Sequence, residues 1–143
     1  MQKYMFKFVD FKILNLSFAI NSDFVAPKAN ESVELGSKLD IGYEKNGKDL
    51  KVYIKIGLNE KSVPFSLTIE GGGLFNFDTE LSDDEINSIA KVNCAAIVFP
   101  YIRESVADIT RRAGFPPLHL PPVNFVEIYK RMNEENKQTQ NSE

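Results

Sequence analysis

Several residue types that support common chemistries are scarce in this 143-residue chain. Tryptophan is absent, and there is one cysteine and one histidine, Cys94 and His119. A single thiol cannot build a disulfide framework or a multi-cysteine zinc site, and one histidine cannot supply a histidine pair. With 17 Lys and Arg against 20 Asp and Glu, the net charge of -3 disfavours general binding to nucleic acid. These scarcities exclude several classes of site. We therefore expect a protein without a cofactor.

Long hydrophobic runs are also missing. The longest strongly apolar run, Ala95 to Phe99, is far shorter than the roughly 20 residues that a membrane-spanning helix needs. Lys7 and Asp10 stand where a signal peptide would need an unbroken apolar stretch. Together with the lone thiol, these features predict a protein of a reducing cytoplasm that does not insert into membranes.

Apolar and polar residues alternate through the first half of the chain, which is the period of a strand with one buried face. The pattern predicts four antiparallel strands at about 6–20, 39–43, 52–58 and 65–69, joined by a connection over 21–37 and a polar turn at 59–62. Phe11 and Ile13 have the opposite parity to the alternating run that begins at Leu14, which predicts a bulge near Ile13 and Leu14. Asn46 and Gly47 tolerate positive φ and predict a tight hairpin.

The apolar spacing becomes helical after residue 82. Ser82 and Glu85 fit a capping box, in which the two side chains satisfy the first free amides of a helix. A longer helix is predicted over 94–113, with Pro100 in its first turns and Gly114 as its C-terminal cap. Strands followed by helices indicate an α+β fold. A sheet with helices on one side leaves its other face open, so that face must be polar or covered by another subunit.

Prolines make residues 115–122 an extended and stiff crossover. Asn124 can cap a last helix. The apolar stripe of that helix consists of Phe125, Ile128, Tyr129 and Met132. Residues from Asn133 onward are polar, so we expect a frayed tail there. The predicted division is a single domain over 1–132, near the usual domain size, and a flexible polar tail over 133–143.

The residues that invite a catalytic or metal-binding interpretation have simpler explanations. Gly71, Gly72 and Gly73 lack the lysine and the helix start of a phosphate loop, and a flexible strand end or a close backbone approach explains them better. His119 has no identifiable nucleophile or orienting carboxylate. Cys94 fits a small buried apolar residue, and the acidic run Asp83–Glu85 fits a helix start. The sequence therefore predicts no catalytic residue, no metal site and no enzyme activity.

Phenylalanine is the abundant aromatic, with 11 residues against 5 tyrosines. Several lie at element ends or in the glycine- and proline-rich connections, where they either close the edges of the core or line a surface groove. An apolar side chain removed from water contributes about 1.5–3 kcal/mol, so a few such anchors are enough for weak, unselective capture of a peptide.

The C-terminal third carries a specific combination of motifs. It runs Val98-Phe99-Pro100-Tyr101-Ile102-Arg103-Glu104, then Gly114-Phe115-Pro116, Leu118-His119-Leu120 and Pro122-Val123-Asn124-Phe125. This combination closely resembles the SecB export-chaperone family. The upstream Gly72-Gly73-Leu74-Phe75 fits the same family, and the order of elements agrees from about Phe6 to Met132.

The resemblance implies a four-stranded antiparallel sheet with two main helices joined by the proline-rich crossover, assembled as a dimer or a tetramer built as a dimer of dimers. It implies a holdase that binds non-native polypeptides, including preproteins, without ATP, and gains avidity from several grooves. The implied client-binding residues are Phe65, Phe75, Leu118, Leu120, Phe125 and Tyr129. The implied oligomer-interface residues are Phe99, Tyr101, Ile102, Val106 and Ile109.

The open sheet face departs from the pattern of export members of the family, which carry carboxylates where the SecA motor docks. The matching positions here are Asn15, Ala19 and Thr68, none of them acidic, with Glu70 nearby. SecA binding is therefore left open, and a dedicated chaperone of an antitoxin in a toxin–antitoxin system is the alternative. A third hypothesis is a small-ligand carrier or enzyme on the same frame, which would need a closed apolar pocket with convergent polar groups.

Overall fold

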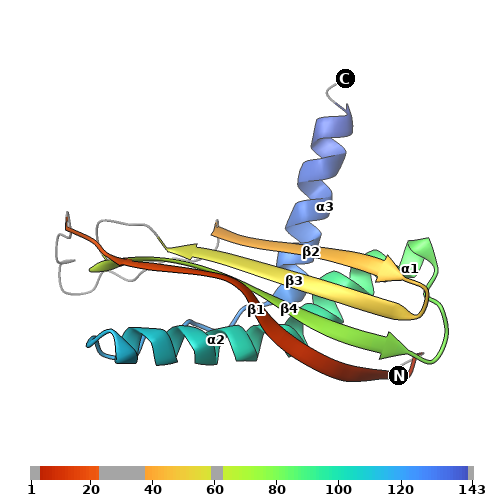
Figure 1. Cartoon of the computed structure of the whole chain (residues 1–143). Helices are drawn as coiled ribbons and strands as arrows, with labels where there is room; N and C mark the ends of the chain where they lie inside the picture. Colours follow the sequence, from red (N-terminus) through yellow and green to blue (C-terminus); the bar gives the residue numbers. More distant parts are fainter. Residues whose placement is uncertain (1–3, 23–37, 59–62, 142–143) are drawn as a thin grey trace.

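Four antiparallel strands form one sheet in the order β1-β4-β3-β2. The strands are β1 Phe6–Ile20, β2 Leu39–Asn46, β3 Asp49–Leu58 and β4 Phe65–Phe77. The computed structural model describes residues 4–22, 38–58 and 63–141, and side chains as far as residue 135 (Figure 1). The predicted sheet is confirmed. Residues 23–37 of the predicted connection, and the predicted turn at 59–62, lie outside the described residues.

The β2–β3 hairpin forms where the sequence predicted it. Asn46 pairs with Asp49 across a two-residue turn, and Gly47 has a φ of 64°, which a residue with a side chain rarely adopts. β4 is longer than predicted because it continues through Gly71–Gly73 to Phe77. The three glycines are therefore in the interior of a strand and not at its end.

β1 contains the predicted bulge and a second one that the sequence did not predict. The register with β4 shifts between Ile13 and Asn15, and also between Phe8 and Asp10. The shift at Ile13 brings the Leu14 side chain to the face of the sheet that has no helices, where it lies over Gly72. This change of parity explains why the apolar residues of β1 change phase along the strand.

The helical region begins where the sequence predicted it, directly after Ser82, and continues without a break into the longer helix predicted over 94–113. α1 Asp83–Ser88 passes into a π-helical segment, η2 Ile89–Cys94, and then into α2 Ala95–Arg112. The Ala95 N–H donates to the Ala90 carbonyl, five residues back. Pro100 lies in the second turn of α2, as predicted, but helical backbone already precedes it.

The predicted capping box is wrong. The Ser82 side chain makes no capping hydrogen bond, although Ser82 does occupy the N-cap position. The Glu85 carboxylate instead accepts a hydrogen bond from the Tyr4 hydroxyl, which comes from the other end of the chain. A tertiary partner therefore replaces the local one that the spacing predicted.

The end of α2 is confirmed in detail. Gly114 has a φ of 97°, its N–H donates to the Arg111 carbonyl, and the Phe115 N–H donates to the Thr110 carbonyl. This pair of hydrogen bonds is the Schellman arrangement that ends many helices. It turns the chain back along α2 and starts the crossover over 115–124.

α3 Phe125–Asn141 begins as predicted, because the Asn124 side-chain oxygen accepts the Glu127 N–H at 3.2 Å. The helix then continues through residues 133–141, where the sequence predicted a frayed tail. Residues 130–140 are mostly Lys, Arg, Met, Glu and Gln, which favour helix, and this propensity explains the extension. α3 projects away from the rest of the molecule (Figure 1).

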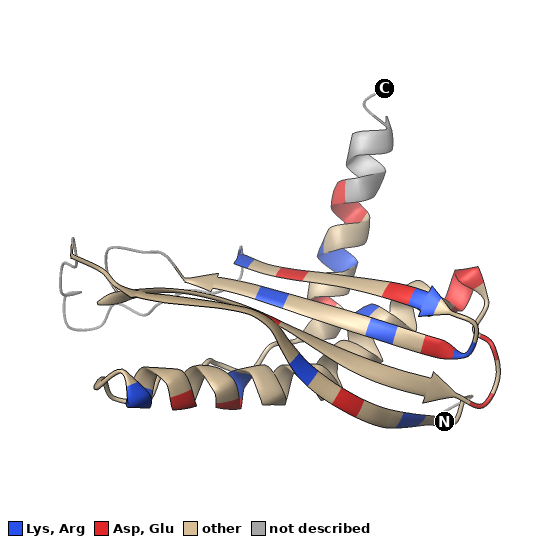
Figure 2. Ribbon diagram, in the orientation of Figure 1, with Lys and Arg blue, Asp and Glu red and all other residues tan. Residues whose placement is uncertain are grey.

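The core lies between the sheet and the helical segment from α1 to α2. Every second residue of β3 and of β4 is buried against it, and the charged residues of these two strands occupy the alternate positions (Figure 2). The glycines at 71 and 73 bring β4 close to α2, since a Cβ on Gly73 would lie 2.5 Å from a Val98 methyl. Among the described helices, none has the length and apolar character needed to cross a membrane.

Candidate functional site

Two side chains of α2 fasten the crossover to that helix. The buried Thr110 hydroxyl accepts the Leu118 N–H at 2.9 Å and donates to the Val106 carbonyl at 2.9 Å. One end of the helix is thus tied to residue 118, and two turns away the Arg103 Nε donates to the Leu120 carbonyl at 2.9 Å. The crossover is therefore held extended along α2, and its position relative to β2 and α3 is fixed.

A hollow of about 200 Å³ lies where the crossover meets β2, β3 and α3. Its walls are apolar, and Glu127 and Arg131 stand among the residues that line it. The lining residues are Leu39, Ile56, Phe99, Pro121, Pro122, Val123, Asn124, Glu127, Ile128 and Arg131. We call this the crossover hollow.

A second depression, of about 460 Å³, shares Pro122, Val123 and Asn124 with the crossover hollow. It continues over η2 and α2 through Val92 and Ala96 and reaches Val126 of α3. The end of the crossover thus separates two apolar concavities, and Val123 contributes to both.

The six predicted client-binding residues do not form one surface. Phe65 and Phe75 lie near opposite ends of β4, and both are buried. Phe65 packs against Phe18 and Phe115, each at 5.3 Å between ring centroids, whereas Phe75 packs against Phe8 at 5.2 Å. These two side chains build the core and do not face solvent.

The other four members of that set lie on the crossover and on α3. Leu120 and Phe125 are buried, and Phe125 meets Phe99 edge to face at 5.6 Å. Leu118 and Tyr129 are half-buried, and Asn87 donates a hydrogen bond to the Tyr129 hydroxyl at 3.4 Å. Client binding through these six residues stays a prediction. The four buried ones, Phe65, Phe75, Leu120 and Phe125, pack in the core beneath the surface.

Sequence reasoning missed Val123, Leu39 and Ile56 as surface-lining residues and placed Ile128 only in a core stripe. Leu39 and Ile56 fit the strand alternation, and they pair with each other at the start of β2, where both line the hollow although both are buried. The alternation within a strand does not show which of its apolar residues will line a hollow. The position of the crossover determines which residues do so.

The predicted oligomer-interface residues divide in a similar way. Phe99, Ile102 and Val106 are buried beneath the sheet. Ile109 is half-buried, while Tyr101 is 41% exposed and stacks on Phe11 at 5.2 Å. The first three residues hold α2 on its own sheet, so an interface on this helix must use the opposite side.

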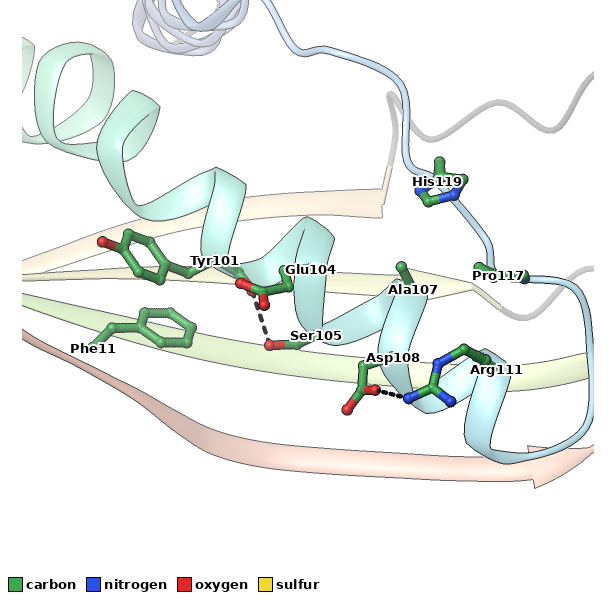
Figure 3. A pocket seen from close by; sticks show the side chains of 9 residues that line it. All are labelled: Phe11, Tyr101, Glu104, Ser105, Ala107, Asp108, Arg111, Pro117 and His119. Atoms are coloured by element: carbon green, nitrogen blue, oxygen red, sulfur yellow. Dashed lines mark hydrogen bonds and ion pairs between the residues drawn. The ribbon is translucent and has the colours of Figure 1, made fainter.

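His119 lies beside a wide depression of about 520 Å³ on that outer side of α2. Figure 3 shows two interactions among the lining residues: Ser105 donates to the Tyr101 carbonyl at 2.9 Å, and Arg111 pairs with Asp108 at 2.7 Å. Hydrogen bonding from Arg111 lowers the pKa of Asp108 below its usual value. No described side chain links His119 to a nucleophile, so the arrangement supports no catalytic role.

Cys94 is fully buried, and burial raises the pKa of its thiol from 9.0 to about 12. At pH 8 the thiolate fraction then falls from about one tenth to about one in ten thousand. We expect iodoacetamide to modify Cys94 at least about a hundredfold more slowly in the native protein than in guanidinium chloride. Mass spectrometry of timed samples measures both rates, and comparable rates would show that the thiol is accessible.

Asn15, Ala19 and Thr68 lie on the face of the sheet turned away from the helices. Asn15 pairs directly with Glu70, and Thr68 and Ala19 pair with serines at 17 and 66. The residues that matched the family's docking positions thus share one face, as the resemblance implied. Glu70 contributes the only carboxylate among these four described positions.

Comparison with known proteins agrees with this fold. The family described as "Preprotein translocase subunit SecB" matches residues 3–136. The uncharacterized protein MJ0357 of Methanocaldococcus jannaschii is 31% identical over 147 residues, covering 96% of this chain and 92% of the relative. The protein-export protein SecB of Neisseria meningitidis serogroup C is 33% identical over 109 residues, covering 76% and 72%. The corresponding match to SecB of Dinoroseobacter shibae spans 64% of that relative, at 29% identity.

Among solved structures, the chain is similar to the Mycobacterium tuberculosis SecB-like chaperone Rv1957, solved in complex with a ChAD peptide from the antitoxin HigA1. The TM-score is 0.66 at 22% sequence identity, and the match covers 82% of this chain and 90% of that chain. At this identity the likeness concerns the fold.

Proposed function

Because the chain belongs to the SecB family, we propose that it is a chaperone that holds non-native polypeptides, preproteins among them, without ATP. The observation that carries the proposal is the crossover hollow with its neighbouring depression, two apolar concavities that share Val123. Their walls consist mostly of aliphatic, proline and phenylalanine side chains, and the polar residues among them are Asn124, Glu127 and Arg131. Such a surface suits apolar side chains of many sequences better than one defined ligand.

The energetics fit a holdase. An apolar side chain of a client contributes about 1.5–3 kcal/mol when it leaves water, so two or three contacts give weak and reversible capture. Several copies of the site in one assembly would raise the apparent affinity through effective concentration. The helical face of β1 supports such an assembly, since Ile13, Leu16 and Ile20 lie on that face and remain exposed. We therefore propose a homo-oligomer, a dimer or a tetramer, acting in the cytoplasm.

Neither of the two apolar concavities is the closed pocket that a small-ligand carrier would need. Ligand pockets usually enclose about 300–1,000 Å³ and bury most of their ligand. The crossover hollow has only about 200 Å³ and is not enclosed. It is suited to one or two side chains of a longer molecule.

The holdase proposal is tested by light scattering from an unrelated protein that aggregates on dilution from denaturant. We expect stoichiometric amounts of the purified chain to suppress the scattering without any nucleotide, and bovine serum albumin at equal mass to leave it unchanged. Aggregation that proceeds unaltered with several different clients would contradict the proposal.

A second candidate, a dedicated chaperone of an antitoxin, is favoured by one observation. The neutral side chains of Asn15, Ala19 and Thr68 stand on the open face, where export members carry carboxylates. Titration of the SecA C-terminal tail separates the two roles, since an export chaperone binds it and a dedicated one does not. A partner antitoxin that stays soluble and stable after deletion of the chaperone would remove the second candidate.

A further inference from the structure

The packing of α2 on the sheet explains two of the three consecutive glycines of β4. A Cβ on Gly71 would lie 3.0 Å from the Ile102 side chain, and a Cβ on Gly73 would lie 2.5 Å from Val98, so both glycines admit the helix. Gly72 faces the other way, toward the side of the sheet without helices. The absence of a side chain at Gly72 therefore has no explanation in the core, and its effect is on the open face.

A depression of about 300 Å³ lies over Gly72 on that face. Leu14, Tyr53 and Leu74 line it with apolar surface. A Cβ on Gly72 would lie 3.1 Å from a Leu14 methyl and 3.3 Å from the Tyr53 ring, so the glycine leaves the floor of the depression open between these two side chains. We call this the open-face depression.

Local features of three strands shape its walls. The second bulge of β1 turns Leu14 onto the open face, where it is 50% exposed. The Tyr53 hydroxyl donates to the Glu44 carboxylate at 3.0 Å, which holds the ring beside Gly72. The two residues paired with Tyr53 are Gly42 of β2 and Gly72 of β4, so no side chain covers the ring from a paired position. The result is a fixed aromatic wall beside bare backbone.

The rim of the open-face depression carries two ammonium groups and one carboxylate, those of Lys12, Lys51 and Asp10. The Asp10 carboxylate accepts a backbone N–H at 2.9 Å and lies 3.9 Å from the Lys12 ammonium. Lys51 stands opposite Glu44 in the register, but that carboxylate accepts the Tyr53 hydroxyl. Among the described side chains, none forms an ion pair with Lys51. The rim therefore has an excess of positive charge, which complements an acidic partner.

We propose that the open-face depression binds an acidic segment of another protein through one aromatic side chain of that segment. A flat ring covers the bare backbone of a strand glycine and packs beside Tyr53, while carboxylates next to the ring meet Lys12 and Lys51. The inference goes beyond the proposed function, because this depression and the helices lie on opposite faces of the sheet. A client held beside the crossover and an acidic partner on the open face would not compete for one surface.

The test uses the full-length protein and two short synthetic peptides of glycine and serine, each with one para-fluorophenylalanine at its centre. Two glutamates flank the ring on each side in the first peptide, and lysines replace them in the second. Fluorine NMR line broadening of the peptide measures the dissociation constants. We expect the glutamate peptide to bind at least about fivefold more tightly than the lysine peptide at about 20 mM sodium chloride, and to lose most of this advantage at about 500 mM.

Gly72→Ala fills the floor of the open-face depression with one methyl group. The chain should keep its fold, because the exposed Leu14 side chain can move toward solvent, and thermal unfolding verifies this. We expect the substitution to weaken binding of the glutamate peptide at least about fivefold. Gly57→Ala is the matched control, since it adds the same methyl group to the same face of the sheet where a Cβ meets nothing within 4 Å. It should change the dissociation constant less than about 1.5-fold. Lys51→Gln should reduce the preference for the glutamate peptide.

Three outcomes would overturn the proposal and leave the holdase proposal standing. The first is equal affinity for the two peptides, or unchanged affinity in both Gly72→Ala and Lys51→Gln. The second is a loss of binding in Ile128→Asp while Gly72→Ala binds normally, because the peptide would then occupy the crossover hollow. The third is a change of assembly state in Gly72→Ala, measured by analytical ultracentrifugation, because a second copy of the chain would then cover the depression.

Discussion

Replacing Gly73 by valine is expected to lower the free energy of unfolding by about 3 kcal/mol or more. Gly73 lies in the interior of β4 with α2 packed across it. A Cβ at this position would stand 2.5 Å from a Val98 methyl and 3.1 Å from the Phe75 ring. Both neighbours are fully buried, so neither can move into open space. The helix must shift, or the strand must bend, to admit the new side chain.

The matched control is valine at Gly42, a strand glycine where a Cβ meets nothing within 4 Å. This substitution should change the free energy of unfolding by less than about 0.5 kcal/mol, or raise it, because valine favours strand conformation. Urea unfolding followed by far-ultraviolet circular dichroism measures both variants in a chain without tryptophan. Similar losses at the two positions would mean that α2 does not pack on β4 as described.

This contrast also explains how far the sequence predicts the fold. Gly47 and Gly114 were predictable because their positive φ angles are local requirements of a hairpin and a helix end. The role of Gly73 depends on where α2 crosses the sheet, which no local pattern records. Ser82 gives the opposite lesson, since its spacing to Glu85 fits a capping box, but Tyr4 takes the glutamate.

The candidate site likewise combines features that the sequence predicts with features that depend on contacts between distant segments. The motifs around Phe99 and Phe125 identify the family, but they do so because these residues build the core beneath the surface, where they meet edge to face. The surface itself comes from shorter side chains such as Val123 and Ile128, which lie where the crossover and α3 leave the core uncovered. Abundant phenylalanine indicated a chain rich in apolar anchors. Which apolar side chains face solvent depends on the position of the crossover. The hydrogen bonds of Thr110 and Arg103 to the crossover fix that position.

Replacing Ile128 by aspartate is expected to weaken client binding by about tenfold to a hundredfold while the chain stays folded. Ile128 is half-buried in the first turns of α3 and lines the crossover hollow. The substitution removes an apolar contact of about 1.5–3 kcal/mol, and each 1.4 kcal/mol corresponds to a factor of ten in affinity. Fluorescence anisotropy with a labelled unfolded polypeptide measures the dissociation constant, and thermal unfolding establishes that the variant retains its fold.

Val126→Asp compares the two concavities, because it places the same carboxylate two residues away on the same helix, in the neighbouring depression. Val126 is 47% exposed and lines the neighbouring depression. If the crossover hollow makes more of the client's apolar contacts than the neighbouring depression, Val126→Asp should weaken binding less than Ile128→Asp does. A larger loss for Val126→Asp than for Ile128→Asp would place the client on the other side of the crossover. Polar substitution of Phe65 or Phe125 is less informative because both side chains are buried. Their loss would destabilise the fold, so weaker binding could not be assigned to a lost client contact.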